Sequence, residues 1–211
     1  DEATSALDSA SEKIIQDAVK KAKDLGAKIV PISLPTTKYA IACYYITVPC
    51  EASANLARFD GIKYGLSHQS GNNLQDVYVK SRGEGFGNEP KKRILIGTFA
   101  LSSGYYDAYY KKAQQVRQLI KEDFAKALKK VDVIFSPVAP FPAFKIGQNT
   151  QDPLSMYLVD IYTAGVKLAG LPGLSLPVGK VGKLPVGLQI IGNYFEESKM
   201  LSVASLMEKV V

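Results

Sequence analysis

Residues 109–137 decide the fold and read YYKKAQQVRQLIKEDFAKALKKVDVIFSP. Apolar side chains recur in this stretch at alternating intervals of three and four, the pattern of a long helix that packs one face on a core. They are Tyr109, Ala113, Val116, Ile120, Phe124, Ala127 and Val131. The helix leads into Val133-Ile134-Phe135, whose continuous apolar character predicts a buried strand. A helix that feeds such a strand predicts an α/β arrangement of layers.

Composition places the chain among ordinary globular proteins. Of its 211 residues, 46% are hydrophobic and 22% are charged, values close to the averages for soluble domains. The length suits one large domain or part of a bigger one. The sequence begins at Asp1 rather than Met, and no positively charged, apolar leader follows. We therefore expect that the chain has no secretory signal and that its amino terminus was cut from a longer chain.

The longest uncharged apolar run covers residues 39–50. It is too short to cross a bilayer and predicts a buried helix instead, with Thr37 as a candidate cap and Pro49 as the point where the helix kinks or ends. Cys43 and Cys50 are the only cysteines. They lack the close pairs of a zinc site, and two cysteines are too few for a disulfide scaffold, which favours free thiols in a reducing cytoplasm.

Shorter signals predict the remaining elements of the first half. Ser9-Ala10-Ser11-Glu12 has the form of a capping box and predicts a helix that ends at Gly26. Residues 28–34 predict a short strand that Pro35 ends. Glycine and polar residues dominate residues 59–90, which predicts surface loops.

The last third of the chain has the pattern of a hairpin followed by a helix. Residues 174–178 and 186–191 predict two strands that the segment 179–182 joins. A final helix should bury one apolar face. That face comprises Met200, Ala204, Met207 and Val211.

The net charge of +6 and the pI near 9.1 raise the question of nucleic acid. Basic residues concentrate between Lys111 and Lys130, and a basic stripe can neutralise phosphates. The same residues fit the solvent-exposed face of the long helix, and no signature of a common RNA-binding module accompanies them. We therefore favour a solvated helix face and keep a non-catalytic, basic RNA-binding piece as the alternative.

Three motifs that could carry chemistry have simpler explanations. His68 is the only histidine, which excludes histidine-based metal sites, and we expect no metal site. A Ser-His-Asp triad would have to use His68, but the sequence has no Gly-x-Ser-x-Gly elbow. We therefore interpret His68 as a solvated loop residue. Residues 83–87 lack the final glycine of a phosphate loop and predict a turn. Ser102-Ser103 could be a nucleophile and its relay, but their place before the long helix favours a cap.

Three polar residues stand in apolar surroundings: Tyr44 in the apolar run, Arg93 before Ile94-Leu95-Ile96, and Asp160 within the segment 156–162. An aspartate in such a segment needs a partner, because burying an unpaired carboxylate is costly. A buried salt bridge between Arg93 and Asp160 and a ligand site explain the pattern equally well at this point.

Six segments carry a resemblance to a known family, and they include residues 84–87 and 93–98. AGLPG at 169–173 and PVGLQ at 185–189 are similar to segments shared across the amidase-signature hydrolases. EASANL at 51–56 and GYYDAYY at 104–110 resemble segments particular to one branch of that family, the A subunits of glutamyl-tRNA(Gln) amidotransferases. The resemblance runs in order from about Lys38 to the end of the chain.

The resemblance implies an α/β fold in which helices cover a mixed β-sheet, with residues 1–211 as the carboxy-terminal part of a single amidase-signature domain. It implies glutamine hydrolysis that supplies ammonia for tRNA-dependent amidation in the cytoplasm, away from membranes. The implied partners are a B and a C subunit. ATP and Mg are expected in a partner subunit, so no cofactor is expected in this chain. The tRNA is expected to bind mainly through the B subunit. The family's catalytic lysine and two serines match nothing here and are expected upstream of Asp1.

The family's substrate-binding tyrosine, arginine and aspartate match Tyr44, Arg93 and Asp160, which we call the substrate clamp. The chemistry agrees, because the planar fork of arginine suits the α-carboxylate of glutamine and an aspartate suits its α-ammonium. Tyr44 adds a hydroxyl on a rigid ring. The alternative within the family is a hydrolase of simple amides, which would not require both charges of the clamp.

This sequence departs from the family's pattern at a few positions near Asp160. Lys167 replaces a usual asparagine, Ala164-Gly165 replaces an Ile-Pro or Thr-Pro pair, and Cys50 replaces a small residue. These departures affect the expected shape of the pocket, and we expect them not to touch the clamp residues themselves.

Overall fold

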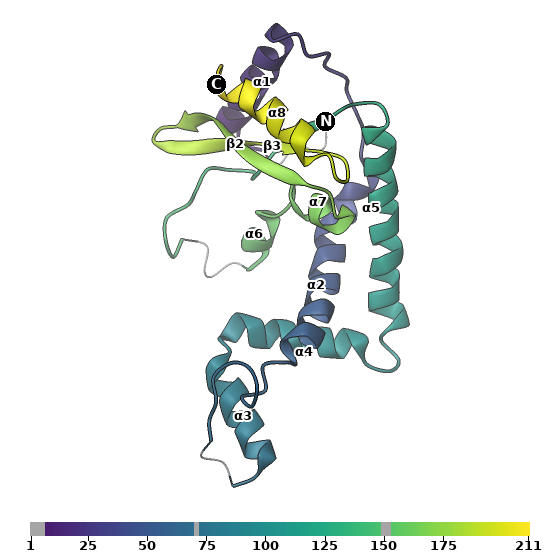
Figure 1. Ribbon diagram of the computed structural model, residues 1–211, viewed down its shortest axis with the longest axis vertical. Coiled ribbons are helices and arrows are strands. Elements are labelled where there is room, and N and C mark those ends of the chain that lie inside the picture. The colour runs from purple at the N-terminus through teal and green to yellow at the C-terminus, as the bar shows by residue number, and fades with distance from the viewer. Residues whose placement is uncertain (1–6, 70–71, 149–152) are drawn as a thin grey trace. The chain divides into compact units, whose positions relative to one another are not determined.

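A computed structural model describes residues 7–69, 72–148 and 153–211. The chain divides into two compact units, which are unit 1 with residues 1–41 and 117–211 and unit 2 with residues 42–116. The helices are α1 (Ser9–Asp24), the 3₁₀ helix η1 (Pro35–Tyr39), α2 (Ala40–Leu56), α3 (Leu74–Gly85), α4 (Asn88–Leu101), the π-helix η2 (Asp107–Lys111), α5 (Lys112–Leu128), α6 (Pro153–Leu158), α7 (Ala164–Ala169) and α8 (Glu197–Glu208) (Figure 1). The strands are β1 (Ile134–Pro137), β2 (Gly173–Val181) and β3 (Leu184–Ile191).

Unit 1 is built on an antiparallel sheet in which β3 lies between β1 and β2. Successive side chains of a strand point to opposite faces, so every second residue of β2 and β3 can enter the same core. The buried core that results joins β2 and β3 to α1 and α8. Its members are Ile15, Ala18, Ala22, Leu176, Val178, Val186, Leu188, Ile190, Met200, Ala204 and Met207. The predicted α/β class, hairpin and last helix are confirmed, although Val211 is 37% exposed rather than buried.

The predicted long helix is also confirmed. Ala113, Ile120, Phe124 and Ala127 are buried along α5, and the helix starts with the π-helical turn η2. The strand prediction for residues 28–34 is wrong, because this segment forms no strand and Ile29 is 45% exposed. Pro31 lies in its middle and cannot donate a ladder hydrogen bond.

The cap of α1 lies one residue earlier than predicted. Asp8 Oδ1 accepts hydrogen bonds from the backbone N–H groups of Ala10 at 3.1 Å and Ser11 at 3.0 Å, as an N-cap side chain does. The predicted end of the helix is confirmed, since Gly26 adopts φ +94° directly after the C-cap.

Unit 2 consists of helices and loops among its described residues, and its helix α2 runs through Pro49. The helix therefore does not end at Pro49. Thr37 does not cap α2 either; its Oγ1 donates to Leu34 O at 2.6 Å, within the turn that leads into η1. Cys43 and Cys50 are buried free thiols, as predicted.

The loop prediction for residues 59–90 missed α3, since glycines near its end obscured a helical pattern. Its N-cap is Asn73, whose Oδ1 accepts from Asp76 N at 2.9 Å. The turn predicted for residues 83–87 is instead the end of α3. Ser102 ends α4 rather than starting the long helix, with Oγ donating to Phe99 O at 2.7 Å.

A close backbone contact joins α2 to α4 within unit 2. A Cβ atom on Gly97 would lie only 2.0 Å from Pro49 O, so only glycine fits at this crossing. Of the helices that the structure describes, none has both the length and the apolar content needed to cross a bilayer.

Candidate functional site

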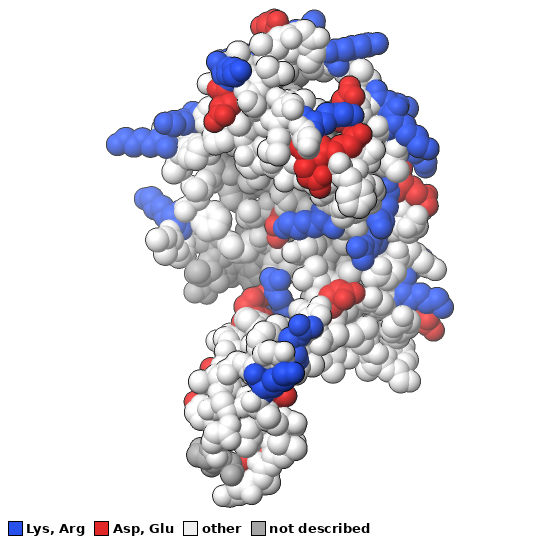
Figure 2. All heavy atoms as spheres, in the orientation of Figure 1, with Lys and Arg blue, Asp and Glu red and all other residues white. Residues whose placement is uncertain are grey.

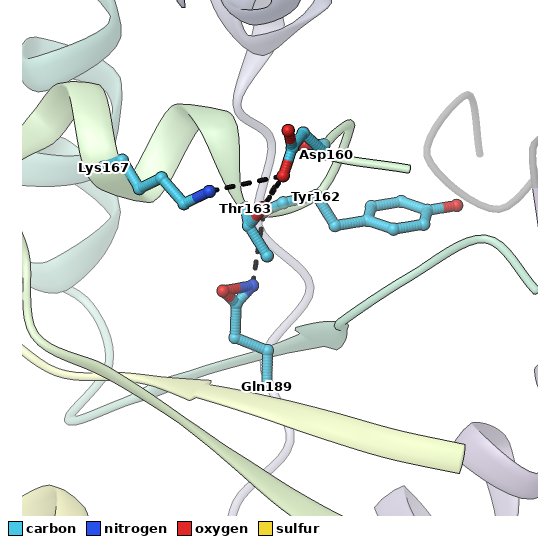
Figure 3. A network of polar contacts seen from close by, with 5 residues as sticks. All are labelled: Asp160, Tyr162, Thr163, Lys167 and Gln189. Carbon is cyan, nitrogen blue, oxygen red and sulfur yellow. Dashed lines mark hydrogen bonds and ion pairs between the residues drawn. The ribbon is translucent and has the colours of Figure 1, made fainter. Parts of the chain in front are cut away.

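Asp160 lies in the turn between α6 and α7, in unit 1 (Figure 3). Its backbone carbonyl accepts hydrogen bonds from the N–H groups of Thr163 at 3.0 Å and Ala164 at 2.8 Å, which fixes the turn against the start of α7. Its Oδ1 atom accepts a hydrogen bond from Thr163 Oγ1 at 3.3 Å and pairs with Lys167 Nζ at 3.3 Å. The Asp160 side chain is 32% exposed, so its carboxylate remains within reach of solvent and of a ligand.

Gln189 ties this turn to the sheet. The side chain is 6% exposed, and its Nε2 donates to Ser136 Oγ on β1 at 3.1 Å and to Tyr162 O at 3.2 Å. Figure 3 shows the amide pointing from β3 toward the turn that bears Asp160. Burial raises the pKa of the neighbouring Tyr162 phenol, which keeps it neutral near pH 7. A buried amide with two partners holds the turn in one position.

Arg93 lies on α4 in unit 2. Its Nε donates to Glu89 Oε1 at 2.9 Å, one helical turn away, and its side chain is 33% exposed. The hydrogen bond to Glu89 raises the pKa of the Arg93 guanidinium above its ordinary value, and the nearby hydroxyls of Tyr45 and Tyr44 add to this effect. The guanidinium is therefore permanently charged and partly accessible.

Tyr44 lies on α2, also in unit 2, and is half-buried. Its ring packs edge-to-face on that of Tyr45, with ring centroids 5.2 Å apart. Tyr44 and Arg93 belong to one unit, whereas Asp160 belongs to the other. The ion partners described for the two charged residues are Glu89 and Lys167, and the clamp as a whole stays a prediction.

Two of the departures, Lys167 and Ala164, do touch Asp160, contrary to expectation. Lys167 pairs with the Asp160 carboxylate through its side chain, and Ala164 binds the Asp160 carbonyl through its backbone N–H. The sequence placed Lys167 seven positions from Asp160, and the turn between them brings the two side chains together. Cys50 lies in unit 2 and is 1% exposed, and burial raises the pKa of its thiol.

The other candidate motifs have structural roles. His68 Nε2 lies 2.7 Å from Glu84 Oε2, and the backbone N–H of His68 donates to Ser81 Oγ at 2.9 Å, so His68 tethers the loop before α3. No group of three potential metal ligands occurs among the residues that the structure describes.

The basic stripe lies on α5 and its flanks. Acidic side chains lie among the basic ones along α5 in Figure 2, and most of the lysines there are exposed. Arg117 and Lys121 are half-buried, and Arg117 Nε donates to Leu168 O at 2.9 Å. These observations favour a solvated helix face with one structural arginine.

A cavity of about 240 Å³ opens in unit 1 beside the sheet. Its lining comprises Ser11, Val138, Ala139, Phe141, Pro142, Ala143, Ser175, Pro177, Pro185, Val186 and Gly187. None of these side chains carries a charge, so the cavity does not fit the charged groups of an amino acid. Asp160 and Arg93 remain the better candidates.

Similarity to known proteins extends along nearly the whole chain. A family model described as Amidase matches residues 2–201. The chain is 54% identical to the A subunit of glutamyl-tRNA(Gln) amidotransferase from Alcanivorax borkumensis, over 94% of this chain and 40% of that protein. It is 58% identical to the protein of the same name from a Geobacillus species, over 92% of this chain and 40% of that protein. The chain thus spans about 40% of the length of these relatives.

Solved structures show the same fold. The crystal structure of the A subunit of glutamyl-tRNA(Gln) amidotransferase from Thermotoga maritima has a TM-score of 0.72 and 37% identity, covering 97% of this chain and 39% of that one. A structure titled only as an amidase has a TM-score of 0.74 and 25% identity, covering 97% and 42%. Because the family model matches nearly the whole sequence, the chain belongs to the amidase family.

Proposed function

We propose that this chain is the glutamine-binding, carboxy-terminal part of an amidotransferase A subunit, and that both units belong to one amidase-signature domain. The observation that carries the proposal is the high identity to proteins of that name along almost the whole chain. The ammonia released from glutamine would amidate misacylated Glu-tRNA(Gln) or Asp-tRNA(Asn). The proposal includes B and C partner subunits, of which the B subunit holds ATP, Mg and most of the tRNA contacts, and a cytoplasmic location.

The clamp residues would each bind one part of glutamine. Arg93 would hold the α-carboxylate with two parallel hydrogen bonds, because its planar fork matches that geometry. Asp160 would hold the α-ammonium. The buried Gln189 side chain, which we call the Gln189 anchor, would keep the Asp160 carboxylate in place. Tyr44 would donate a hydrogen bond from its hydroxyl. Bound this way, the side-chain amide of glutamine would project away from the clamp, toward the nucleophile expected outside this chain.

The amide bond would be cleaved by residues outside this chain. In the proposed mechanism a neutral lysine takes a proton from the nucleophilic serine through a second serine, which activates a weak nucleophile without histidine. We therefore expect the 211-residue chain alone to release no ammonia from glutamine. Release above the buffer rate that Ser102→Ala and Ser103→Ala abolish would show that those serines act as the nucleophile and its relay.

A conservative substitution in the complete complex tests the proposed function. Arg93→Lys keeps the charge and removes the two-pronged geometry. Removing one member of a buried charge pair outright costs about 2–5 kcal/mol, which corresponds to roughly 30-fold to several thousand-fold in binding; because Arg93→Lys retains the charge, this range is the upper bound for its effect. We expect glutamine-dependent amidation to fall accordingly, while amidation from added ammonia persists because ammonia bypasses the pocket.

Asp160→Asn should have the same selective effect. If both variants keep a near-normal KM and kcat for glutamine and only melt at lower temperature, the two residues are structural and the chain belongs to the alternative, a hydrolase of simple amides.

A further inference from the structure

The ion pair between Lys167 and Asp160 bears on which substrates the site prefers. Lys167 Nζ lies 3.3 Å from Asp160 Oδ1 (Figure 3). A lysine ammonium and the α-ammonium of an amino acid are the same kind of group, a compact cation with three N–H donors. A carboxylate that already pairs with one ammonium attracts a second one less strongly, because its charge is partly neutralised.

The surrounding contacts hold the Asp160 carboxylate beside α7, within reach of Lys167. Asp160 cannot easily turn away from α7, because its carbonyl accepts from Ala164 N at 2.8 Å and its Oδ1 accepts from Thr163 Oγ1 at 3.3 Å. Gln189 holds the same turn from the sheet through Tyr162 O. Lys167 projects from α7 toward this fixed carboxylate (Figure 3).

We propose that Lys167 is a specificity-determining residue that competes with the α-ammonium of the substrate at Asp160. The competition lowers the preference of the site for amino-acid amides over otherwise identical amides that lack the α-ammonium. This inference rests on the proposed function, because it requires Asp160 to face the substrate. The side chains of Lys167 and Asp160 are 50% and 32% exposed, so solvent screens the pair and the effect is several-fold rather than orders of magnitude.

The test compares two substrates in the complete amidotransferase, with the partners of this chain bound. Glutaramate is glutamine without the α-ammonium, and ammonia release gives kcat/KM for each compound. Lys167→Asn should raise the ratio of glutamine to glutaramate by about two- to fivefold, the range for partly exposed ion pairs. Lys167→Gln, a second neutral variant, should do the same, while Lys167→Arg keeps the cation and should leave the ratio near that of the wild type.

Lys20 offers a matched control, since its Nζ pairs with Asp17 Oδ1 at 3.0 Å on α1. Lys20→Asn should leave the ratio unchanged, and a change there would assign the effect to net charge and overturn the proposal. A ratio that stays constant or falls in both neutral Lys167 variants would also overturn it.

Asp160→Asn separates the two levels of the hypothesis. If it lowers the ratio while the neutral Lys167 variants do not raise it, Asp160 binds the ammonium and only the competition by Lys167 is wrong. If Asp160→Asn leaves the ratio unchanged, the role of Asp160 in the proposed function fails, and the inference fails with it.

Discussion

The two units reach their structures by different means. Unit 1 buries large apolar side chains between a sheet and two helices, and Leu188 and Ile190 are completely inaccessible. In unit 2 the buried apolar side chains among the described residues are those of Cys43, Pro49, Cys50, Ala100 and Ala113, none of which is large. Large apolar residues of unit 2 instead reach the surface, with Leu95 70% and Phe99 49% exposed.

This difference shows what each unit depends on. Burial of a large aliphatic side chain contributes about 1.5–3 kcal/mol, so the core of unit 1 can stabilise it from within. Unit 2 relies on close backbone packing, such as that of Gly97 on Pro49, and on capping and loop hydrogen bonds. Under the proposed function, the ammonium-binding Asp160 lies in the unit with the larger core and the carboxylate-binding Arg93 in the other.

The largest expected effect comes from opening the core of unit 1. Leu188→Ala should lower the free energy of unfolding by about 2–5 kcal/mol, because it removes buried contacts and leaves a cavity. Leu95→Ala, at an exposed site of unit 2, should change it by no more than about 0.5 kcal/mol. Urea unfolding followed by circular dichroism measures both. Equal losses in the two variants would contradict the difference between the units.

Removing the Gln189 anchor should have the next largest effect. Gln189→Leu leaves Ser136 Oγ and Tyr162 O without this donor, which costs about 1–3 kcal/mol when the groups are buried. Gln118 offers a control on the exposed face of α5, where its Nε2 donates to Glu122 Oε1 at 3.1 Å. Gln118→Leu should be nearly neutral. Similar melting temperatures for the two variants would show that the anchor does not stabilise the turn.

Two glycines test the packing of unit 2, because their substitution should act in opposite directions. Gly97→Ala places a Cβ against Pro49 O and should destabilise the protein by about 1–3 kcal/mol. Gly83→Ala meets nothing within 4 Å and should stabilise α3 by about 0.5–1 kcal/mol. Hydrogen exchange of the α2 and α4 amides reports the first effect locally. Unchanged protection in Gly97→Ala would rule out the close contact.

The smallest effect is a pH dependence in a loop of unit 2. Asp60 Oδ1 accepts from Ile62 N at 2.8 Å and Lys63 N at 3.2 Å, and these bonds lower the pKa of its carboxyl. A lowered folded-state pKa means that the stabilisation is present above the unfolded pKa and is lost as the pH falls through the folded value. Exchange of the Ile62 and Lys63 amides should therefore accelerate, relative to neighbouring loop amides, at acid pH. Asp60→Asn should remove this pH dependence, and its persistence would assign it to another group.

Much of unit 1 could be predicted from sequence because periodicity and burial coincide there. The stripe of α5 and the alternation in β2 and β3 both follow from one buried face. In unit 2 the pattern is weaker, since exposed apolar residues and helical glycines such as Gly83 blur it, and α3 was missed. Its cap was nevertheless readable, because Asn73 precedes Asp76 at the spacing of an N-terminal signal.

The residues of the candidate site also differ in how well the sequence predicts them. Arg93 and Asp160 could be selected because charged residues in apolar segments require partners. The Lys167 pair could not, because a separation of seven residues brings side chains together only when the intervening turn has the particular geometry seen before α7. Gln189 gave no signal either, since an uncharged polar residue in an apolar strand does not reveal which groups it will bind.

The central claim is that Arg93 and Asp160 hold opposite charges of one substrate, and crossed substrate analogues test it most directly. Glutaramate lacks the α-ammonium of glutamine, and 4-aminobutanamide lacks its α-carboxylate. Measured in the complete complex, Arg93→Lys should reduce the preference for glutamine over 4-aminobutanamide, because it loses the two-pronged geometry, and should preserve the preference over glutaramate. Asp160→Asn should do the reverse. If each variant instead lowers kcat/KM for all three compounds by the same factor, the residues do not contact the two charges and the clamp is wrong.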